Sequence, residues 1–240
     1  MIAMTDGAVS PAGVLEYRLG RLGRAMAKSM ATATSTAALS QVTKQIDLGS
    51  VVEDRESLDD PVSVNTYVLA AVAACLGRHP MLNGRLEDKT VITPDAVNLG
   101  VAVAVDEGLL VPIVHSADQL GFDQLDEAVN AIAAKARSNE LVFADIDGGT
   151  FTVSNLGMYG IDGGFAIPPP PQGAILLVGR AKKAFVPAED DSPEVRTLAW
   201  FGLTFDHRFI DGATAAALLT DINKALADAR GLRATAGTAA

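Results

Sequence analysis

Three histidines are the candidates for acid–base chemistry in this chain of 240 residues, because imidazole ordinarily titrates near neutral pH. His79 precedes a proline at the end of a helical pattern and His115 closes a strand-like run, which favours structural roles for both. His207 lies in Asp-His-Arg-Phe-Ile-Asp-Gly, between a strand pattern and a helix pattern. Such a junction projects side chains into a cleft, where an imidazole can take a substrate proton. On spacing alone, a structural motif in which the aspartates cap the helix is equally acceptable.

The segments before and after His207 determine where its side chain lies. Residues 196–205 read as a strand, and Asp211 and Gly212 open a helix for which Gly231 supplies a stop. The apolar stripe of this last helix consists of Ala215, Leu218, Leu219, Ile222 and Leu226. Further strands are predicted at 150–153, 173–179 and 183–186. The run 168–171 is all proline and lacks backbone donors, which predicts a stiff loop at a sheet edge.

The N-terminal half alternates between helical and extended patterns. Apolar residues at helical spacing from Leu15 to Met30, with Arg and Lys between them, predict an amphipathic first helix. The remaining predicted elements are a weak strand at 40–52, a helix at 65–76, a hairpin-like pair at 96–105 and 109–114, and a helix at 125–136. Residues 1–13 are expected to be disordered and 233–240 to form a flexible tail. One folded domain, 14–232, remains.

Composition excludes several classes of function. A net charge of −10 opposes binding to nucleic acid, which depends on Lys and Arg contacts to phosphate. The single cysteine, Cys75, excludes a disulfide framework, and its apolar surroundings predict core packing. No hydrolase elbow, phosphate-binding loop or clustered ligand set is present, so no metal is expected. Without a signal-like N-terminus or an apolar run of about 18 residues, we expect a soluble, cytoplasmic protein without membrane partners.

Two segments resemble signatures of the dihydrolipoamide acyltransferases of 2-oxoacid dehydrogenase complexes. Residues 206–212, DHRFIDG, resemble the family's DHRxxDG signature, and residues 151–160, FTVSNLGMYG, resemble its FT(I/V)SNLGM(F/Y)G segment. Shorter matches are PMLNG at 80–84, NLGVAV at 98–103, GLLVPIV at 108–114 and PPQGAIL at 170–176. The resemblance covers about residues 20 to 228, so the chain is similar to the catalytic inner core of these enzymes.

The resemblance implies a fold and a reaction. The fold is α/β of the mixed α+β kind, similar to chloramphenicol acetyltransferase, with a large mixed β-sheet flanked by helices in a trimer. The reaction is acyl transfer between dihydrolipoamide and coenzyme A. His207 is then the catalytic base that takes the thiol proton, and Ser154 the hydroxyl that stabilises the oxyanion. Asp211 becomes a carboxylate that holds the site together through a buried ion pair.

Four further residues are carried over with smaller roles. Asn155 and Gly157 are expected to shape the loop beside Ser154, Arg208 to be structural or to contact a ligand, and Gly212 to permit close helix approach. The resemblance also places the site between subunits of a homotrimer. Coenzyme A is a substrate, and the lipoyl group sits on a separate domain or chain, since family members carry lipoyl domains before the core. Partners are therefore lipoyl domains and dehydrogenase complex components.

The first helix departs from the family, because residues 23–30, GRAMAKSM, place Gly23 where arginine is usual. Two alternatives stay open: a free-standing coenzyme A-dependent acyltransferase acting on a small acceptor, and a non-catalytic core or binding component. Retention of His207, Ser154 and Asp211 together favours an enzyme. The SNLGMYG segment favours acetyl as the acyl group, with succinyl the least expected.

Overall fold

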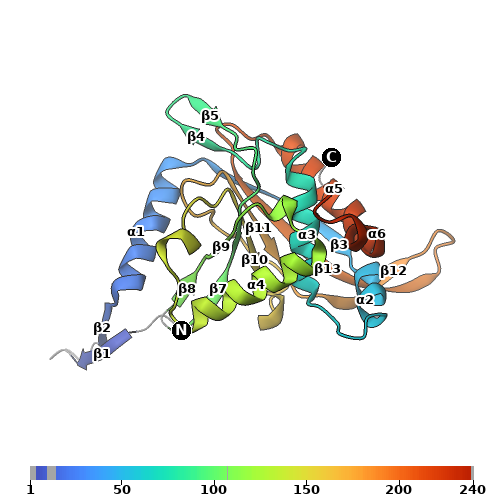
Figure 1. Cartoon of the computed structure of the whole chain (residues 1–240), viewed down its shortest axis with the longest axis horizontal. Coiled ribbons are helices and arrows are strands. Elements are labelled where there is room, and N and C mark those ends of the chain that lie inside the picture. Colours follow the sequence, from blue (N-terminus) through green and yellow to red (C-terminus); the bar gives the residue numbers. More distant parts are fainter. Residues whose placement is uncertain (1–3, 10–14, 107, 239–240) are drawn as a thin grey trace.

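A seven-stranded mixed sheet forms the centre of the molecule (Figure 1). The computed structural model describes residues 4–9, 15–106 and 108–238. The strand order is β12-β13-β11-β10-β6-β9, and β3 pairs with β13 off this path. The bounds are β3 Leu39–Asp47, β6 Leu99–Val101, β9 Ile113–Val114, β10 Phe151–Asn155, β11 Ala174–Val178, β12 Lys182–Pro187 and β13 Pro193–Asp206. All four strands predicted after residue 149 are confirmed.

Strand direction decides at which end of the sheet each loop emerges. Strand β10 runs parallel to β6 and β11, whereas β13 runs antiparallel to β11, β12 and β3. The chain therefore leaves β10 and β13 at opposite ends of the sheet. The predicted mixed sheet flanked by helices is confirmed.

One face of the sheet is covered by helices, visible in front of it in Figure 1. These helices are α2 Gly49–Glu56, α3 Val64–Leu76, α4 Phe122–Arg137, α5 Gly212–Ala227 and α6 Ala229–Thr235. Ser63 caps the N-terminus of α3, where its hydroxyl accepts the N–H of Thr66, and the helix is buried along most of its length. Phe151 and Val153 of β10 pack into this core. Within the described ranges, no helix is long and apolar enough to cross a membrane.

The opposite face of the sheet carries smaller and more polar side chains. Thr152 and Ser154 alternate with Phe151 and Val153 along β10 and therefore face away from the helices. The loop 160–172 lies over this face, where the carbonyl of Gly164 accepts a hydrogen bond from Gln41 at 2.9 Å. Beside it, Met158, Tyr159, Ile161, Phe165 and Trp200 leave large apolar side chains exposed.

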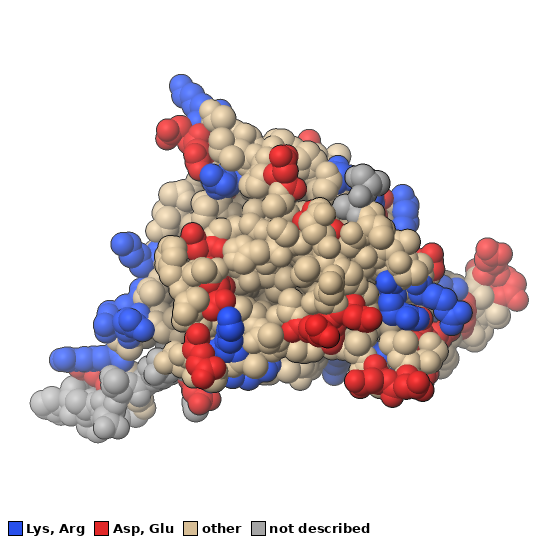
Figure 2. Space-filling view, in the orientation of Figure 1, with Lys and Arg blue, Asp and Glu red and all other residues tan. Residues whose placement is uncertain are grey.

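The first helix begins later than predicted. Residues Leu15–Leu19 form strand β2, paired with β1 Met4–Val9, and α1 spans Arg21–Thr36 at the edge of the molecule (Figure 1). Leu15 and Leu19 fit a helical period, but strand pairing overrides it. Figure 2 shows Lys and Arg gathered along α1, while acidic residues lie over α4. The short hairpins are β4 Arg85–Glu87 with β5 Thr90–Ile92, and β7 Val103–Val105 with β8 Gly108–Leu110.

Other boundaries also differ. Residues 4–9 of the segment expected to be disordered form β1, and 1–3 and 10–13 lie outside the described residues. Gly231 does not end the last helix. Helix α5 ends at Ala227, and after Asp228 the chain continues as α6, which contains Gly231. The tail expected from residue 233 starts within α6, where Arg233 donates to the buried Asp54 at 2.9 and 3.1 Å. Residues 49–52 begin α2 and do not extend the preceding strand.

Candidate active site

His207 is the first residue after β13, and its main chain is fixed by β3. Its N–H donates to the carbonyl of Ala38 at 2.8 Å, which continues the pairing of β13 with β3 by one residue. The imidazole lies against the ring of Phe205, with centroids 5.5 Å apart, and is exposed. No hydrogen bond joins the imidazole to any side chain or main-chain atom in the described part of the chain. Both ring nitrogens are therefore available to a substrate.

Asp206, the residue before His207, points into the protein. Its side chain is buried, and Arg208 binds it with two parallel hydrogen bonds, Nε to Oδ1 at 3.0 Å and Nη2 to Oδ2 at 2.6 Å. Burial works against ionisation of Asp206, but the Arg208 guanidinium and the N–H groups of Arg208 and Ala38 outweigh it. The pKa of Asp206 is therefore below its ordinary value.

Ser154 stands near the end of β10, half-buried on the helix-free face. The following loop is held by Asn155, whose side-chain oxygen accepts the N–H of Gly157 at 2.9 Å and whose amide nitrogen donates to Asn65 at 3.2 Å. A Cβ at Gly157 would lie 2.9 Å from the carbonyl oxygen of Gly179, closer than real side chains allow. Asn155 and Gly157 therefore fix the shape of this loop.

Ser154 and His207 of one chain lie far apart. Ser154 is in register with Leu177 of β11, which is in register with Gly202 of β13, and His207 follows Gly202 by five residues. With about 3.3 Å per residue along a strand and about 4.8 Å between strands, the two residues are separated by about 20 Å. A base and an oxyanion donor must each approach the same reacting thioester within about 3 Å. One chain cannot supply both residues to one substrate.

A cavity of about 420 Å³ opens beside the His207 loop. Its lining comes from the end of α1, the tip of the β4–β5 hairpin, the proline loop and the Asp206–Arg208 pair. The lining residues that bear most on the site are Thr36, Pro171, Asp206, Arg208 and Phe209. The volume suits a small-molecule ligand or an extended thiol arm.

Asp211 does not take part in the expected buried ion pair. It is exposed, and its carboxylate accepts the N–H of Thr214 at 2.7 Å as the N-cap of α5, which lowers the pKa of Asp211. The buried ion pair of this motif is formed by Asp206 with Arg208. The sequence does not single out Asp206 as a site residue, although Arg208 follows it by two positions. Gly212 does not permit close helix approach, since nothing lies within 4 Å of a Cβ placed there.

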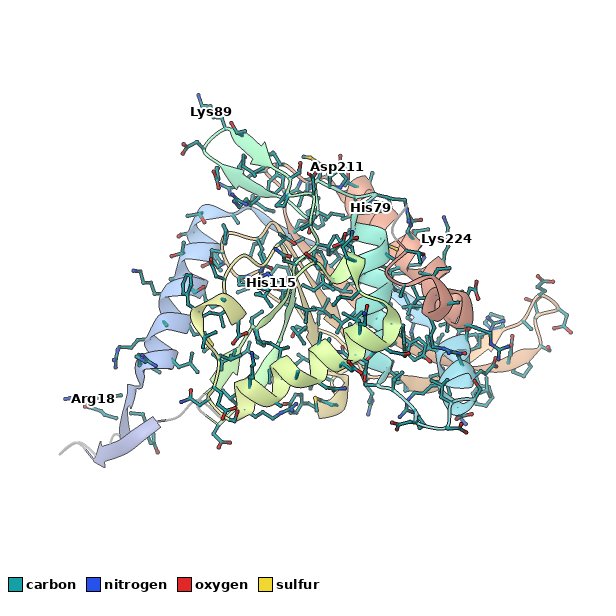
Figure 3. The ribbon with its side chains drawn as sticks, viewed as in Figure 1. Arg18, His79, Lys89, His115, Asp211 and Lys224 are labelled. Carbon is teal, nitrogen blue, oxygen red and sulfur yellow. The ribbon has the colours of Figure 1, made fainter. Side chains whose placement is uncertain are left out.

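The other two histidines have structural partners. His79 lies 3.1 Å from Asp221 of α5, and the ring of His115 lies 2.9 Å from the carbonyl oxygen of Ala144. Figure 3 shows His79 and Asp211 toward the same end of the molecule and His115 in its middle. Cys75 is buried, and burial raises the pKa of its thiol to about 11. These residues therefore fit the structural roles predicted for them.

The class of fold follows from the structural comparisons. A structure of chloramphenicol acetyltransferase matches with a TM-score of 0.57 at 18% identity, covering 83% of this chain and 94% of that one, which shows a shared fold. A probable dihydrolipoamide acetyltransferase from Listeria monocytogenes matches with a TM-score of 0.87 at 28% identity, covering 91% and 96%. An Azotobacter vinelandii dihydrolipoamide acetyltransferase, studied for a serine, a histidine and an asparagine in its catalytic mechanism, matches with a TM-score of 0.84 at 28% identity, covering 91% and 93%.

The chain belongs to the 2-oxoacid dehydrogenase acyltransferase family, whose catalytic-domain model matches residues 15–233. A succinyltransferase component of the 2-oxoglutarate dehydrogenase complex from Rickettsia bellii is 31% identical over 219 residues, 88% of this chain and 54% of the relative. An acetyltransferase component of the pyruvate dehydrogenase complex from the same organism is 33% identical over 215 residues, covering 85% and 51%. The chain spans about half the length of these curated relatives. The predicted family and fold are confirmed.

Proposed function

We propose that this protein transfers an acyl group between dihydrolipoamide and coenzyme A, as a core component of a 2-oxoacid dehydrogenase complex. The observation that carries this proposal is His207, an exposed imidazole with both nitrogens unengaged, on a main chain fixed by β3. It lies in the segment that matches the family signature. Coenzyme A acts as a substrate, and the lipoyl group comes from a separate domain or chain.

His207 acts as the general base in this proposal. A thiol with a pKa of about 8.5 is mostly protonated at neutral pH, whereas the thiolate is the nucleophile. The imidazole takes the thiol proton as the sulfur attacks the thioester carbonyl, and returns it to the departing thiol when the tetrahedral intermediate collapses. The cavity beside the His207 loop gives a thiol arm room to approach.

Ser154 supplies the oxyanion donor. Its side chain makes no hydrogen bond to any other group within the described ranges, so its hydroxyl is free to donate to the tetrahedral oxygen. A donor of this kind stabilises a transition state by about 3 kcal/mol. The loop locked by Asn155 and Gly157 keeps the hydroxyl in place.

The separation of Ser154 and His207 supports an active site between two copies of the chain. In a homotrimer, the Ser154 end of one sheet meets the His207 end of a neighbour, and one interface forms one site. The exposed apolar side chains of Met158, Tyr159 and Phe165 lie just after Ser154 and suit such an interface. A separated chain would therefore lack a complete site.

Asp211 enters this proposal as a residue that supports the site. Among the residues studied in the Azotobacter acetyltransferase, the asparagine follows the histidine by four positions. Asp211 follows His207 at the same spacing. Aspartate and asparagine are comparable helix N-caps. We assign Asp211 to fixing the start of α5 behind His207.

Acetyl is the acyl group we propose, although the relatives include both succinyl and acetyl transferases. A succinyl group carries a carboxylate, which calls for a cation near the reacting carbon. In the structure, Arg208 is paired with Asp206, and Arg180 and Lys182 near the Ser154 loop are both paired with Asp162. Acetyl requires no such cation.

We place the protein in the cytoplasm.

Thioester exchange between acetyl coenzyme A and free dihydrolipoamide tests the proposed function. The wild type should be active, and His207→Ala should lower kcat by about 1,000-fold, while the mass of the assembly stays that of the wild type. Isobutyryl and succinyl donors run in parallel test the acyl choice. A wild type inactive with all three donors would contradict the lipoamide reaction and favour a small acceptor or a non-catalytic core.

A further inference from the structure

We propose that Asp206 is a positioning residue for His207, and that its side chain does this by accepting hydrogen bonds from Ala38 and Arg208, which lie beside the histidine. The inference rests on the proposed function of His207. Asp206 itself does not reach a substrate, because it is 4% exposed. It acts on the base through the main chain.

The geometry centres on the peptide groups of Ala38. The carbonyl of Ala38 accepts the N–H of His207 at 2.8 Å, while its N–H donates to Oδ1 of Asp206 at 3.2 Å. The same Oδ1 accepts the N–H of Arg208 at 3.1 Å. The main chain of His207 is thus bonded to Ala38, just before β3, and the side chain of Asp206 links the N–H of Ala38 to the N–H of Arg208.

The donors around Asp206 require a carboxylate. Oδ1 accepts two main-chain N–H groups and Nε of Arg208, and Oδ2 accepts Nε and Nη2 of Arg208. Every one of these partners is a donor. An asparagine could serve the main-chain groups with its oxygen, but its NH2 group would then face the guanidinium, donor against donor. The ion pair therefore locks the orientation that the main-chain bonds need.

The imidazole of His207 depends on this arrangement, because the main chain alone positions it. In chymotrypsin-like sites a carboxylate orients the base directly. Here, within the described part of the chain, the ring makes no hydrogen bond, and it lies against Phe205 of β13. A displacement of about 1 Å in a catalytic group can lower a rate about 100-fold.

Asp206→Asn tests the inference by kinetics. We expect kcat to fall about 100-fold while KM for coenzyme A and for dihydrolipoamide stays within about threefold, since Asp206 lines the cavity with a side chain that is only 4% exposed. Glu194→Gln is the matched control, because it removes an exposed carboxylate paired with Arg196 on the same strand β13. It should leave kcat and KM at wild-type values.

Rescue separates positioning from general destabilisation. The double variant Asp206→Asn with Arg208→Gln replaces the ion pair by two amides, in which the new NH2 group meets an oxygen in place of a guanidinium. We expect the double variant to recover kcat about tenfold over Asp206→Asn alone. If the double variant is no better than the single one, the proposed role of the pair is wrong.

A second readout does not need activity. With three histidines in the chain, the imidazole carbon-bound proton signals can be assigned in an NMR spectrum by comparison with His207→Ala. Asp206→Asn should shift or broaden the His207 signal and leave those of His79 and His115 unchanged, and the double variant should restore it. An unchanged His207 signal in Asp206→Asn overturns the inference. A wild type without activity whose His207 signal still responds would refute the proposed function and leave the positioning role standing.

Discussion

Ser154 and His207 of the same chain occupy opposite ends of one β-sheet, about 20 Å apart by strand geometry. The separation arises because β10 and β13 both flank β11 but run in opposite directions. A histidine base and a serine donor are each well placed for thioester exchange, yet no single thioester can touch both within one chain. The catalytic unit we propose is therefore an interface between copies.

Asp211 provides a first prediction. Because it acts as the N-cap of α5 through the N–H of Thr214, Asp211→Asn should keep both stability and thioester exchange close to those of the wild type. Asp211→Ala removes the cap and should lower the free energy of unfolding by about 1 kcal/mol. Chemical denaturation and the acetyl exchange assay measure the two effects. A loss of activity of more than tenfold in Asp211→Asn would show that the negative charge itself is needed.

Gly157 provides a second prediction, on the loop that holds Ser154. Gly157→Ala places a methyl group 2.9 Å from the carbonyl oxygen of Gly179, so the loop must shift and carry Ser154 with it. We expect kcat to fall by about tenfold or more, with the fold retained. Gly77→Ala is the control, because nothing lies within 4 Å of a Cβ at Gly77. Equal activity of the two variants would mean that the loop does not position Ser154.

The third prediction concerns stability and pH. Asp54 is buried and accepts hydrogen bonds from Arg233 of α6 and from the hydroxyl of Tyr67 at 2.8 Å. The Arg233 side chain first, and the Tyr67 hydroxyl in addition, outweigh the cost of burial and lower the pKa of Asp54. Asp54→Asn should lower the free energy of unfolding at neutral pH by about 2 to 3 kcal/mol. This loss lies at or below the low end of the range for breaking a fully buried ion pair, because Arg233 is partly exposed.

The pH dependence of this loss has a definite sign. A carboxyl whose pKa is lowered by folding stabilises the protein fully above its unfolded pKa, which is about 3.9, and loses that contribution as pH falls through the folded value. The difference between wild type and Asp54→Asn, measured by denaturant unfolding, should therefore be constant near neutrality and shrink below about pH 4. If the difference in unfolding free energy between wild type and Asp54→Asn stays the same in acid, the loss of stability comes from packing and not from the charge of Asp54.

Much of the site was predictable from local sequence. The strand ending at Asp206 and the helix opening after Asp211 are adjacent in the chain, so their junction needs no tertiary information. The role of Asp211 was not predictable, because an N-cap and an ion-pair partner both call for a carboxylate. Which of the two aspartates in the motif is buried depends on Ala38, whose N–H lies 168 positions away from Asp206 along the chain.

The predictions near the two ends of the chain were wrong for the same reason, namely that the structure there depends on residues distant in the sequence. Leu15 and Leu19 suit a helix and a strand equally, and only pairing with residues 4–9 selects the strand. Helix α6 extends past Gly231, and its Arg233 binds Asp54, 179 positions earlier. Long-range partners of this kind leave no periodic signal in the sequence.

The most direct test of the shared site is complementation between inactive chains. Ser154→Ala and His207→Ala subunits, each carrying a different affinity tag, are co-expressed, and assemblies that contain both are purified and assayed for acetyl exchange. Homogeneous Ser154→Ala should lose about 100-fold in kcat and His207→Ala about 1,000-fold. Light scattering checks that all three preparations have the mass of a trimer.

If each site takes Ser154 from one copy and His207 from the next, every trimer that contains both kinds of subunit has one of its three sites with both residues intact. The mixed trimers should then show about a third of wild-type activity, far above either parent. If both residues came from one chain, every site would carry one defect. Mixed trimers no more active than their parents would contradict the intersubunit site.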